Sequence, residues 1–244
     1  MHESSTAAEP RARAYGVAAL LASLVFLGVL TALFIPALSK ARNSARAAAC
    51  AGSLKQVSLI LAVYADKNGG RYPPLSPIPG RIMFPHEMVY PEYMTDFSVV
   101  ICYGHPEKKR LKASPVDVAV DDHSHFYMSH VVSNEKEVRA FAEAYRMRVA
   151  EGKSFDEDFT VPDGQGNNAG NTLFRIRNGI DKVLSIPAAT IPVTVERPGR
   201  HDPPGLNVLY LDGHVECIGY GKRFPMTEAV IAALTSLDRL AAPL

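Results

Sequence analysis

The sequence has almost no charge imbalance, little cysteine and none of the short motifs that mark common catalytic or nucleotide sites. Its 26 Lys and Arg residues stand against 25 Asp and Glu residues, so no basic field favours nucleic acid and no acidic field favours cations. It contains no Gly-x4-Gly-Lys-Ser/Thr phosphate loop, no His-Glu-x2-His, no Cys-x2-Cys and no nucleophile elbow. These absences predict a protein that is not an enzyme, binds no nucleic acid and uses no cofactor.

One long uncharged run stands near the start of the chain. Residues 15–35, YGVAALLASLVFLGVLTALFI, carry no charge and would extend roughly 32 Å as a helix, enough for a hydrocarbon core of about 30 Å. We therefore predict a membrane anchor. A cleaved signal peptide and a buried core helix are the alternatives. The run is longer than the apolar core of a signal peptide, and it continues as helix through Pro36 toward Lys40 and Arg42.

The same helix changes character in its second half. Pro36 predicts a kink or a freed carbonyl near the membrane boundary rather than an end. The run Asp66-Lys67-Asn68-Gly69-Gly70 predicts the end, with glycine available for a left-handed cap. Between them an apolar stripe recurs at steps of three and four, formed by Leu54, Val57, Leu61 and Tyr64. The helix is thus expected to be lipid-embedded at its start and packed on a soluble head at its end.

An aromatic residue that opens about twenty apolar residues, followed by Pro and an amphipathic half-helix, resembles the N-terminus of type IV pilins and type II secretion pseudopilins. The resemblance implies a first mature residue at Tyr15, cleavage after Ala14 by a prepilin peptidase, and methylation of the new amine. Arg11 and Arg13 would form the basic leader. The family usually has Gly before the cut and an acidic residue at the fifth mature position, where this chain has Ala14 and Ala19. These departures favour a minor or non-polymerising subunit.

The last third of the chain resembles the C-terminal module of a bacterial family of pseudopilin-like proteins. That module has an Arg-x-Arg-x-Gly-Ile stretch, a short strand ending in an acidic residue, and a His-x9-Asp-Gly-His-Val motif, here with ten intervening residues. Independently, the alternating pattern of NVLYLDGHVECI predicts a β-hairpin with a positive-φ turn at Asp212-Gly213. The matching residues are Arg175, Arg177, Gly179, Ile180, Glu196, His201, Asp212, Gly213, His214 and Val215.

Two groups of polar residues could be read as metal sites. His123 and His125 would point the same way on a strand, but a polar loop that enters the strand FYMSHVV explains them more simply. The second group has residue types that suit zinc or a general base, but a turn shaped by Asp212 explains it without a metal. We expect no metal at either. The second group consists of His201, Asp202, Asp212 and His214.

The three cysteines allow one disulfide. Cys50 lies early on the soluble half of the helix, and Cys102 ends the apolar run SVVIC. A bridge between them would tie the helix to the head, and such a bridge is expected outside the cytoplasm. Three reduced, buried thiols are the alternative. Cys217 lies outside this pair and is predicted to be a small buried apolar residue.

The remaining segments predict further elements of one head domain. The Pro-rich residues 71–93 should be irregular, with Ile82, Met83, Phe84, Met88 and Tyr90 buried. Two amphipathic helices are expected, one capped by Asn134 and ending at Gly152, the other capped by Thr227. Two shorter segments have simpler predictions: a buried strand at residues 98–102 and an exposed turn at residues 107–110.

These patterns predict an α+β fold in which a long N-terminal transmembrane-plus-amphipathic helix packs on an antiparallel, pilin-like sheet. The expected divisions are a leader or disordered cytoplasmic tail at 1–14, a membrane and spine helix at 15–68, and a head at 69–244. Charge alone weakly favours a cytoplasmic head, because Lys40, Arg42 and Arg46 follow the run and Arg11 and Arg13 precede it. The resemblance to pilins implies the reverse: a single-pass protein of the bacterial inner membrane with a periplasmic head.

The function that the resemblance implies is structural. The chain would be a pseudopilin-like component of a type II secretion or type IV pilus-like system for protein transport. Its partners would be the membrane, other pseudopilins or secretion-apparatus proteins through the N-terminal helix, and prepilin peptidase. The alternatives are a membrane-anchored periplasmic binding module for polysaccharide or ion ligands, and an anchored metalloenzyme.

Overall fold

The first helix, α1, is the longest element of the fold. The computed structural model describes residues 8–116, 124–199 and 205–240, without the side chains of residues 8–14 and 18. The chain divides into two compact units, Met1–Arg42 and Asn43–Leu244, and we call the second unit the head. Helix α1 (Ala8–Lys67) runs through both and continues through Pro36, as predicted. It begins before Tyr15, so residues 8–14 are helical rather than part of a disordered tail.

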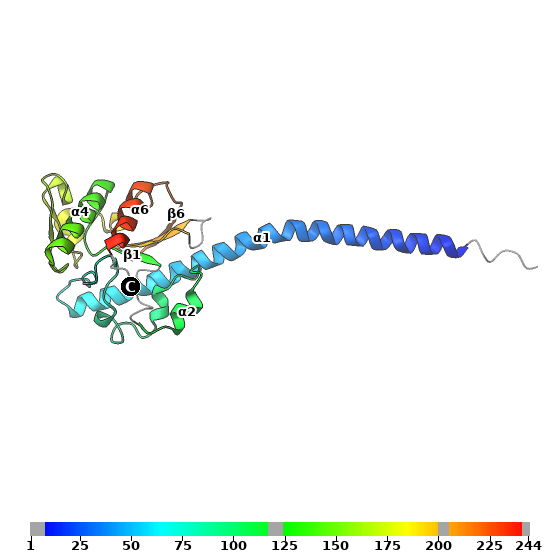
Figure 1. Cartoon of the computed structure of the whole chain (residues 1–244), viewed down its shortest axis with the longest axis horizontal. Coiled ribbons are helices and arrows are strands. Elements are labelled where there is room, and N and C mark those ends of the chain that lie inside the picture. Colours follow the sequence, from blue (N-terminus) through cyan, green and yellow to red (C-terminus); the bar gives the residue numbers. More distant parts are fainter. Residues whose placement is uncertain (1–7, 117–123, 200–204, 241–244) are drawn as a thin grey trace, which may run out of the picture. The chain divides into compact units, whose positions relative to one another are not determined.

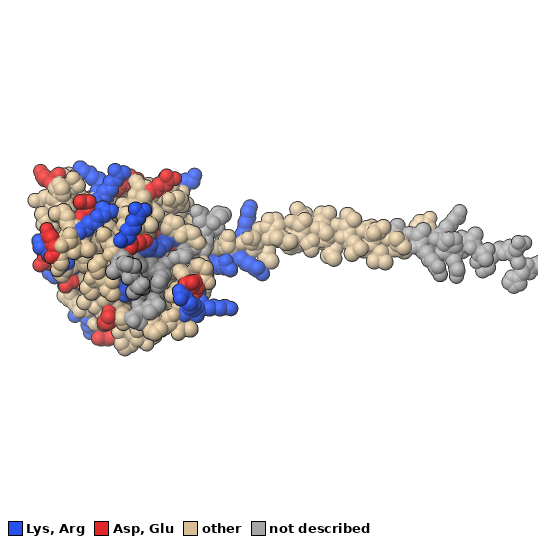
Figure 2. Space-filling model, in the orientation of Figure 1, with Lys and Arg blue, Asp and Glu red and all other residues tan. Residues whose placement is uncertain are grey.

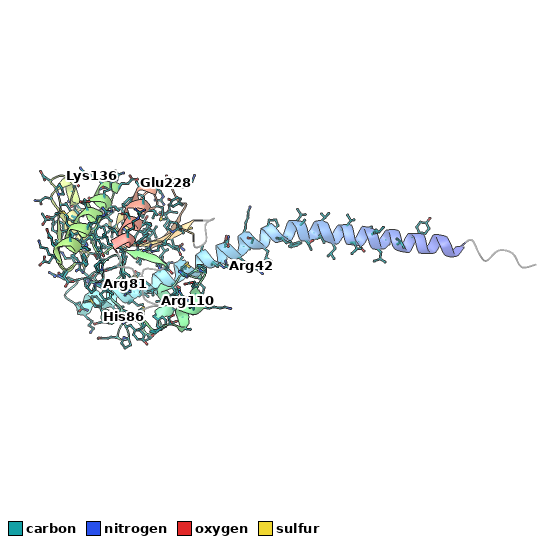
Figure 3. The ribbon with its side chains drawn as sticks, viewed as in Figure 1. Arg42, Arg81, His86, Arg110, Lys136 and Glu228 are labelled. Carbon is teal, nitrogen blue, oxygen red and sulfur yellow. The ribbon has the colours of Figure 1, made fainter. Side chains whose placement is uncertain are left out.

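The described side chains of α1 in the first unit are exposed, apart from that of Leu30, which is half-buried. We call residues 15–35 the apolar segment; its large side chains include Phe26, Phe34 and Ile35, which are 66–68% exposed. Figure 2 shows this stretch without Lys, Arg, Asp or Glu, and Figure 3 shows its side chains along the ribbon. By length and composition α1 is long and apolar enough to cross a membrane.

The second half of α1 belongs to the core of the head. The predicted stripe of Leu54, Val57, Leu61 and Tyr64 is buried, and each of these side chains is at most 8% exposed. The helix ends at Lys67, and both Gly69 and Gly70 have positive φ. The backbone N–H of Gly70 donates to the carbonyl of Ala65, which satisfies a carbonyl of the last turn. The predicted stripe and end of the spine helix are confirmed.

An antiparallel sheet of four strands, in the order β1-β4-β5-β6, forms the centre of the head. Every residue of β4 and β5 is buried, so other elements cover both faces of the sheet. Figure 1 shows α4 and α6 on one side and the second half of α1 along the other. The strands are β1 (His125–Tyr127), β4 (Pro192–Glu196), β5 (Leu206–Tyr210) and β6 (Val215–Ile218).

The helices that cover the sheet have the predicted caps. In α4 (Glu135–Glu151) the Asn134 side chain accepts from the N–H of Glu137 at 3.0 Å, and Gly152 ends the helix at φ 65°. In α6 (Glu228–Thr235) the Thr227 side chain accepts from the N–H of Val230. A mixed helix and antiparallel-sheet fold behind a long apolar N-terminal helix is therefore confirmed. The smaller elements are α2 (Lys108–Ala113), α5 (Ile180–Leu184), β2 (Phe159–Thr160), β3 (Thr172–Leu173), η1 (His86–Met88), η2 (Phe97–Val100), η3 (Asn167–Ala169), η4 (Ala188–Thr190) and η5 (Ser236–Leu240).

Three local predictions are wrong. The apolar run at 98–102 is not a strand: η2 covers Phe97–Val100, because the Asp96 carboxylate accepts from the N–H of Ser98 and caps a helical turn. The charged run at 107–110 enters the short helix α2 instead of a turn. Met88 is 39% exposed rather than buried, although the proline-rich segment around it is irregular as predicted.

Candidate functional site

The leader-cleavage residues lie on the exposed first part of α1. Tyr15 is 75% exposed, and Ala19 is also exposed. Ala14 is helical, and its side chain is not among those described. Cleavage after Ala14 remains a prediction.

The C-terminal motif forms the connection between β5 and β6. The N–H of Gly213 donates to the carbonyl of Tyr210 at 2.9 Å, and only Gly213 of the Asp-Gly pair has positive φ, 85°. The predicted hairpin is confirmed, but its turn is longer than the two-residue turn expected, since Leu209 pairs with Val215. A Cβ at Gly213 would lie 3.1 Å from Ser58 Oγ, so this turn packs directly against α1.

Within the turn, Asp212 and His214 contact each other. One Asp212 oxygen accepts from the His214 N–H at 3.1 Å and lies 2.5 Å from His214 Nδ1. The His214 ring stacks on Tyr210 at a centroid distance of 4.4 Å. His201 and Asp202, the other two candidates, lie outside the described residues, so convergence of the four remains untested. The described contacts of Asp212 and His214 lie within the turn and stabilise its conformation.

Two described histidines of the segment 121–130, His125 and His130, are buried in the fold. His123 lies outside the described residues, while His125 is in β1 and 3% exposed. His130 is fully buried and stacks on Phe159, and its two ring nitrogens contact Ser129 Oγ at 2.9 Å and the carbonyl of Glu157 at 3.0 Å. Burial lowers the pKa of His130 to about 3. His130 is therefore a neutral core residue near pH 7.

The two predicted disulfide partners do meet. Cys50 of α1 and Cys102, just after η2, are each 1% exposed, and their sulfurs lie 2.8 Å apart. Both are thiols in the structure, so the disulfide remains a prediction. The N–H of Tyr103 donates to Cys50 Sγ at 3.0 Å, and the N–H of Gly104 donates to Cys102 Sγ at 3.2 Å. Cys217 is exposed, which contradicts its predicted burial.

A glutamate from the sheet completes this cluster. Glu196, the last residue of β4, is 0% exposed, and a carboxylate oxygen lies with both sulfurs inside a span of 4.8 Å. Asn207 of β5 donates to that carboxylate through its backbone N–H at 2.8 Å and its side chain at 3.2 Å. The same side-chain nitrogen donates to the carbonyl of Ala47 in α1 at 3.0 Å. The cluster thus joins α1, the β4–β5 pair and the segment after η2 in the interior of the head.

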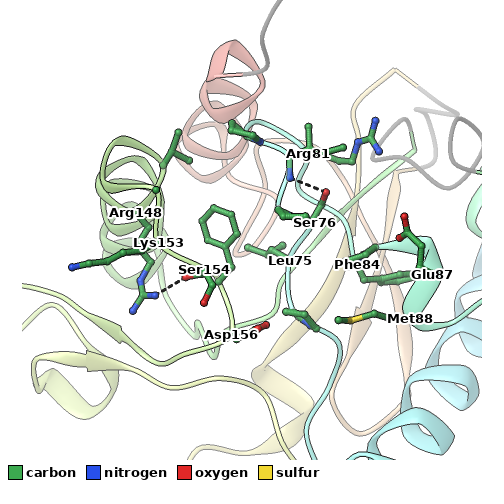
Figure 4. A pocket seen from close by; sticks show the side chains of 18 of the residues that line it. Leu75, Ser76, Arg81, Phe84, Glu87, Met88, Arg148, Lys153, Ser154 and Asp156 are labelled. Atoms are coloured by element: carbon green, nitrogen blue, oxygen red, sulfur yellow. Dashed lines mark hydrogen bonds between the residues drawn. The ribbon is translucent and has the colours of Figure 1, made fainter.

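The head also has a cavity of about 600 Å³ between the proline-rich segment and the end of α4 (Figure 4). Leu75, Phe84 and Met88 contribute apolar surface to it. Two of its basic residues already have partners: Arg148 donates to the carbonyl of Ser154, which also lines the cavity, at 2.6 Å, and Lys153 pairs with Glu151 at 2.8 Å. The cavity has the size of a small-ligand site.

Comparisons of the chain with protein families, with curated proteins and with solved structures find no match.

The sequence predicts that Cys50 and Cys102 meet, but it does not predict that Glu196 joins them. Glu196 was singled out only as a match to the C-terminal module, more than 90 residues from Cys102 in the chain. No ligand spacing connects the three residues, because each comes from a different element. Val195 of β4 pairs with Val208 of β5, so Glu196 and Asn207, one residue further along each strand, lie opposite each other. This register depends on tertiary contacts and cannot be predicted from local sequence patterns.

Proposed function

We propose that the chain is a structural, pseudopilin-like protein of the bacterial inner membrane, with a single membrane pass and a periplasmic head. It would act in a type II secretion or type IV pilus-like apparatus. The observation that carries this proposal is the division of α1 (Ala8–Lys67) into an exposed apolar segment and a half whose stripe is buried in the head. A helix of this kind anchors a domain and offers apolar surface to neighbouring helices.

The exposed surface of α1 indicates which partners the protein would bind. Most Leu, Val and Phe side chains of the apolar segment are more than half exposed, and Gly16 and Gly28 leave room for close backbone approach. Lipid and the corresponding helices of other subunits would cover this surface. Ala19 provides no acidic group for subunit register, which favours a minor or non-polymerising role.

The first experiment is the N-terminal sequence and intact mass of the full chain, purified from bacterial membranes after co-expression with a prepilin peptidase. We expect a chain that begins at Tyr15 and expect Ala14→Gly to raise the cleaved fraction, because Gly is the family's usual residue there. Ala48→Gly, at an exposed alanine further along α1, is the matched control and should not change cleavage. A chain that keeps its leader in both wild type and Ala14→Gly, while a standard prepilin is cleaved in parallel, contradicts the proposal.

The cavity favours a second candidate, the membrane-anchored binding module for polysaccharide. Met88 lines the cavity and is partly exposed, whereas Met147 is exposed and does not line it. If the second candidate is right, Met88→Glu should abolish retention of the full chain on insoluble polysaccharide and Met147→Glu should not. Equal retention of both variants would remove the cavity from consideration.

A further inference from the structure

The buried cluster of Cys50, Cys102 and Glu196 has the donor set of a metal site. Two sulfurs and one carboxylate oxygen lie within 4.8 Å of one another, and the three residues are 0–1% exposed. Burying a carboxylate beside two thiols is unfavourable unless hydrogen bonds or a cation compensate it. A disulfide would use the two sulfurs alone, whereas a divalent cation would use all three groups and also offset the carboxylate charge, which Asn207 already stabilises by hydrogen bonds.

We propose that Cys50, Cys102 and Glu196 bind Zn²⁺ inside the head. Zinc takes thiolate and carboxylate ligands together, while the carboxylate oxygen makes the site less suited to Cu(I), which prefers sulfur. The three side chains fill three of four tetrahedral positions and leave one for a water molecule or a further group. This proposal does not depend on the proposed membrane function.

The surroundings of the cluster fit this role. The N–H groups of Tyr103 and Gly104 point at the two sulfurs and would offset thiolate charge. Asn207 holds the Glu196 carboxylate with two hydrogen bonds, as outer-shell residues hold metal ligands.

The site must open slightly to accept the ion. Two sulfurs at about 2.3 Å from a tetrahedral Zn²⁺ are about 3.8 Å apart, whereas Cys50 Sγ and Cys102 Sγ are 2.8 Å apart. A change of about 1 Å is within the reach of cysteine side-chain rotation. By bridging α1, β4 and the segment after η2, the ion would hold the spine helix to the sheet.

The test is the zinc content of the full chain, purified in detergent without chelator and measured by mass spectrometry of the metal. We expect about one zinc per chain in wild type and in Cys217→Ser, the exposed-cysteine control. Cys50→Ser and Cys102→Ser should lose at least 90% of the metal. Asn207→Ala should weaken affinity by about 10–100-fold, as expected for an outer-shell residue.

A second measurement does not depend on the folding of any variant. The reduced wild-type chain is titrated with Co²⁺, whose thiolate charge-transfer absorption reports sulfur ligation directly. Its appearance at one equivalent supports the site. Absence of this absorption overturns the proposal. It is also overturned if the chain is purified without zinc and Cys217 is the only thiol that reacts under denaturing, non-reducing conditions, a result that would identify Cys50–Cys102 as a disulfide.

Discussion

The apolar segment and the head contain similar side chains in opposite environments. Leu, Val and Phe of the apolar segment are mostly more than half exposed, whereas Leu54 and Leu61, on the same helix α1, are 0–1% exposed. Both stretches are helical, so the backbone does not distinguish them. What differs is the polar content: Lys55, Gln56 and Ser58 interrupt the second stretch. The first has no charged residue, and the hydroxyls of Ser23 and Thr31 donate to carbonyls of the same helix. One helix can therefore serve a lipid environment and a protein core in turn.

The sharpest test of this comparison lies within the packed half of α1. Leu61→Ala should lower the free energy of unfolding of the head by about 2–5 kcal/mol, because it leaves a cavity in the core. Leu59→Ala, two residues away and at a side chain that is 68% exposed, should change it by about 0.5 kcal/mol or less. Urea unfolding of the full chain in detergent, followed by tyrosine fluorescence, measures both. Equal effects would mean that the stripe does not face the core.

A charge in the apolar segment tests the other side of the comparison. Leu27→Arg places a charge near the centre of the predicted span and should make insertion less favourable by about 2.5–3.5 kcal/mol. The membrane fraction that resists alkaline carbonate extraction should fall accordingly. Leu59→Arg, also on an exposed face of α1, is the control and should remain in the membrane. If both variants stay membrane-bound, the apolar segment is not the anchor.

Acid should lower the folding stability of the head but should not change the membrane attachment of the apolar segment. His130 binds a proton in the unfolded chain near pH 6.5, but burial lowers its pKa in the fold to about 3. The unfolded state therefore takes up a proton first, and stability falls as pH drops from 6.5 towards 3, by up to about 1.4 kcal/mol per pH unit. His130→Gln should flatten this slope in urea unfolding series, while membrane retention stays constant across the same range. An unchanged slope in the variant would assign the acid sensitivity to other groups.

The sequence predicts the elements of this fold better than their contacts. The stripe of α1, the caps at Asn134 and Thr227, and the hairpin around Gly213 follow from local periodicity and side-chain chemistry, which act over a few residues. The run at 98–102 was misassigned because Asp96, outside the apolar pattern, caps a helical turn. Apolar runs of this length do not distinguish a strand from a buried turn.

The cluster around Cys50 shows a different limit. Its pairing with Cys102 could be proposed because cysteines are few, but Glu196 and Asn207 reach it only through the register of β4 and β5. Polar residues at the end of one strand and the start of the next are common, and the local sequence does not indicate that these two face a helix. The chemistry of such a site becomes visible only when tertiary contacts are known.

The smallest effect expected separates capping from packing within the head. Asn134→Ala removes the side chain that accepts from the N–H of Glu137 and should lower the free energy of unfolding by about 1 kcal/mol. Asn134→Asp keeps an acceptor at the start of α4, where negative charge is also favoured by the helix dipole, and should retain the stability. Urea unfolding of the two variants beside wild type measures the difference. A loss in Asn134→Asp as large as in Ala would show that packing of the side chain, and not the cap, stabilises this end of α4.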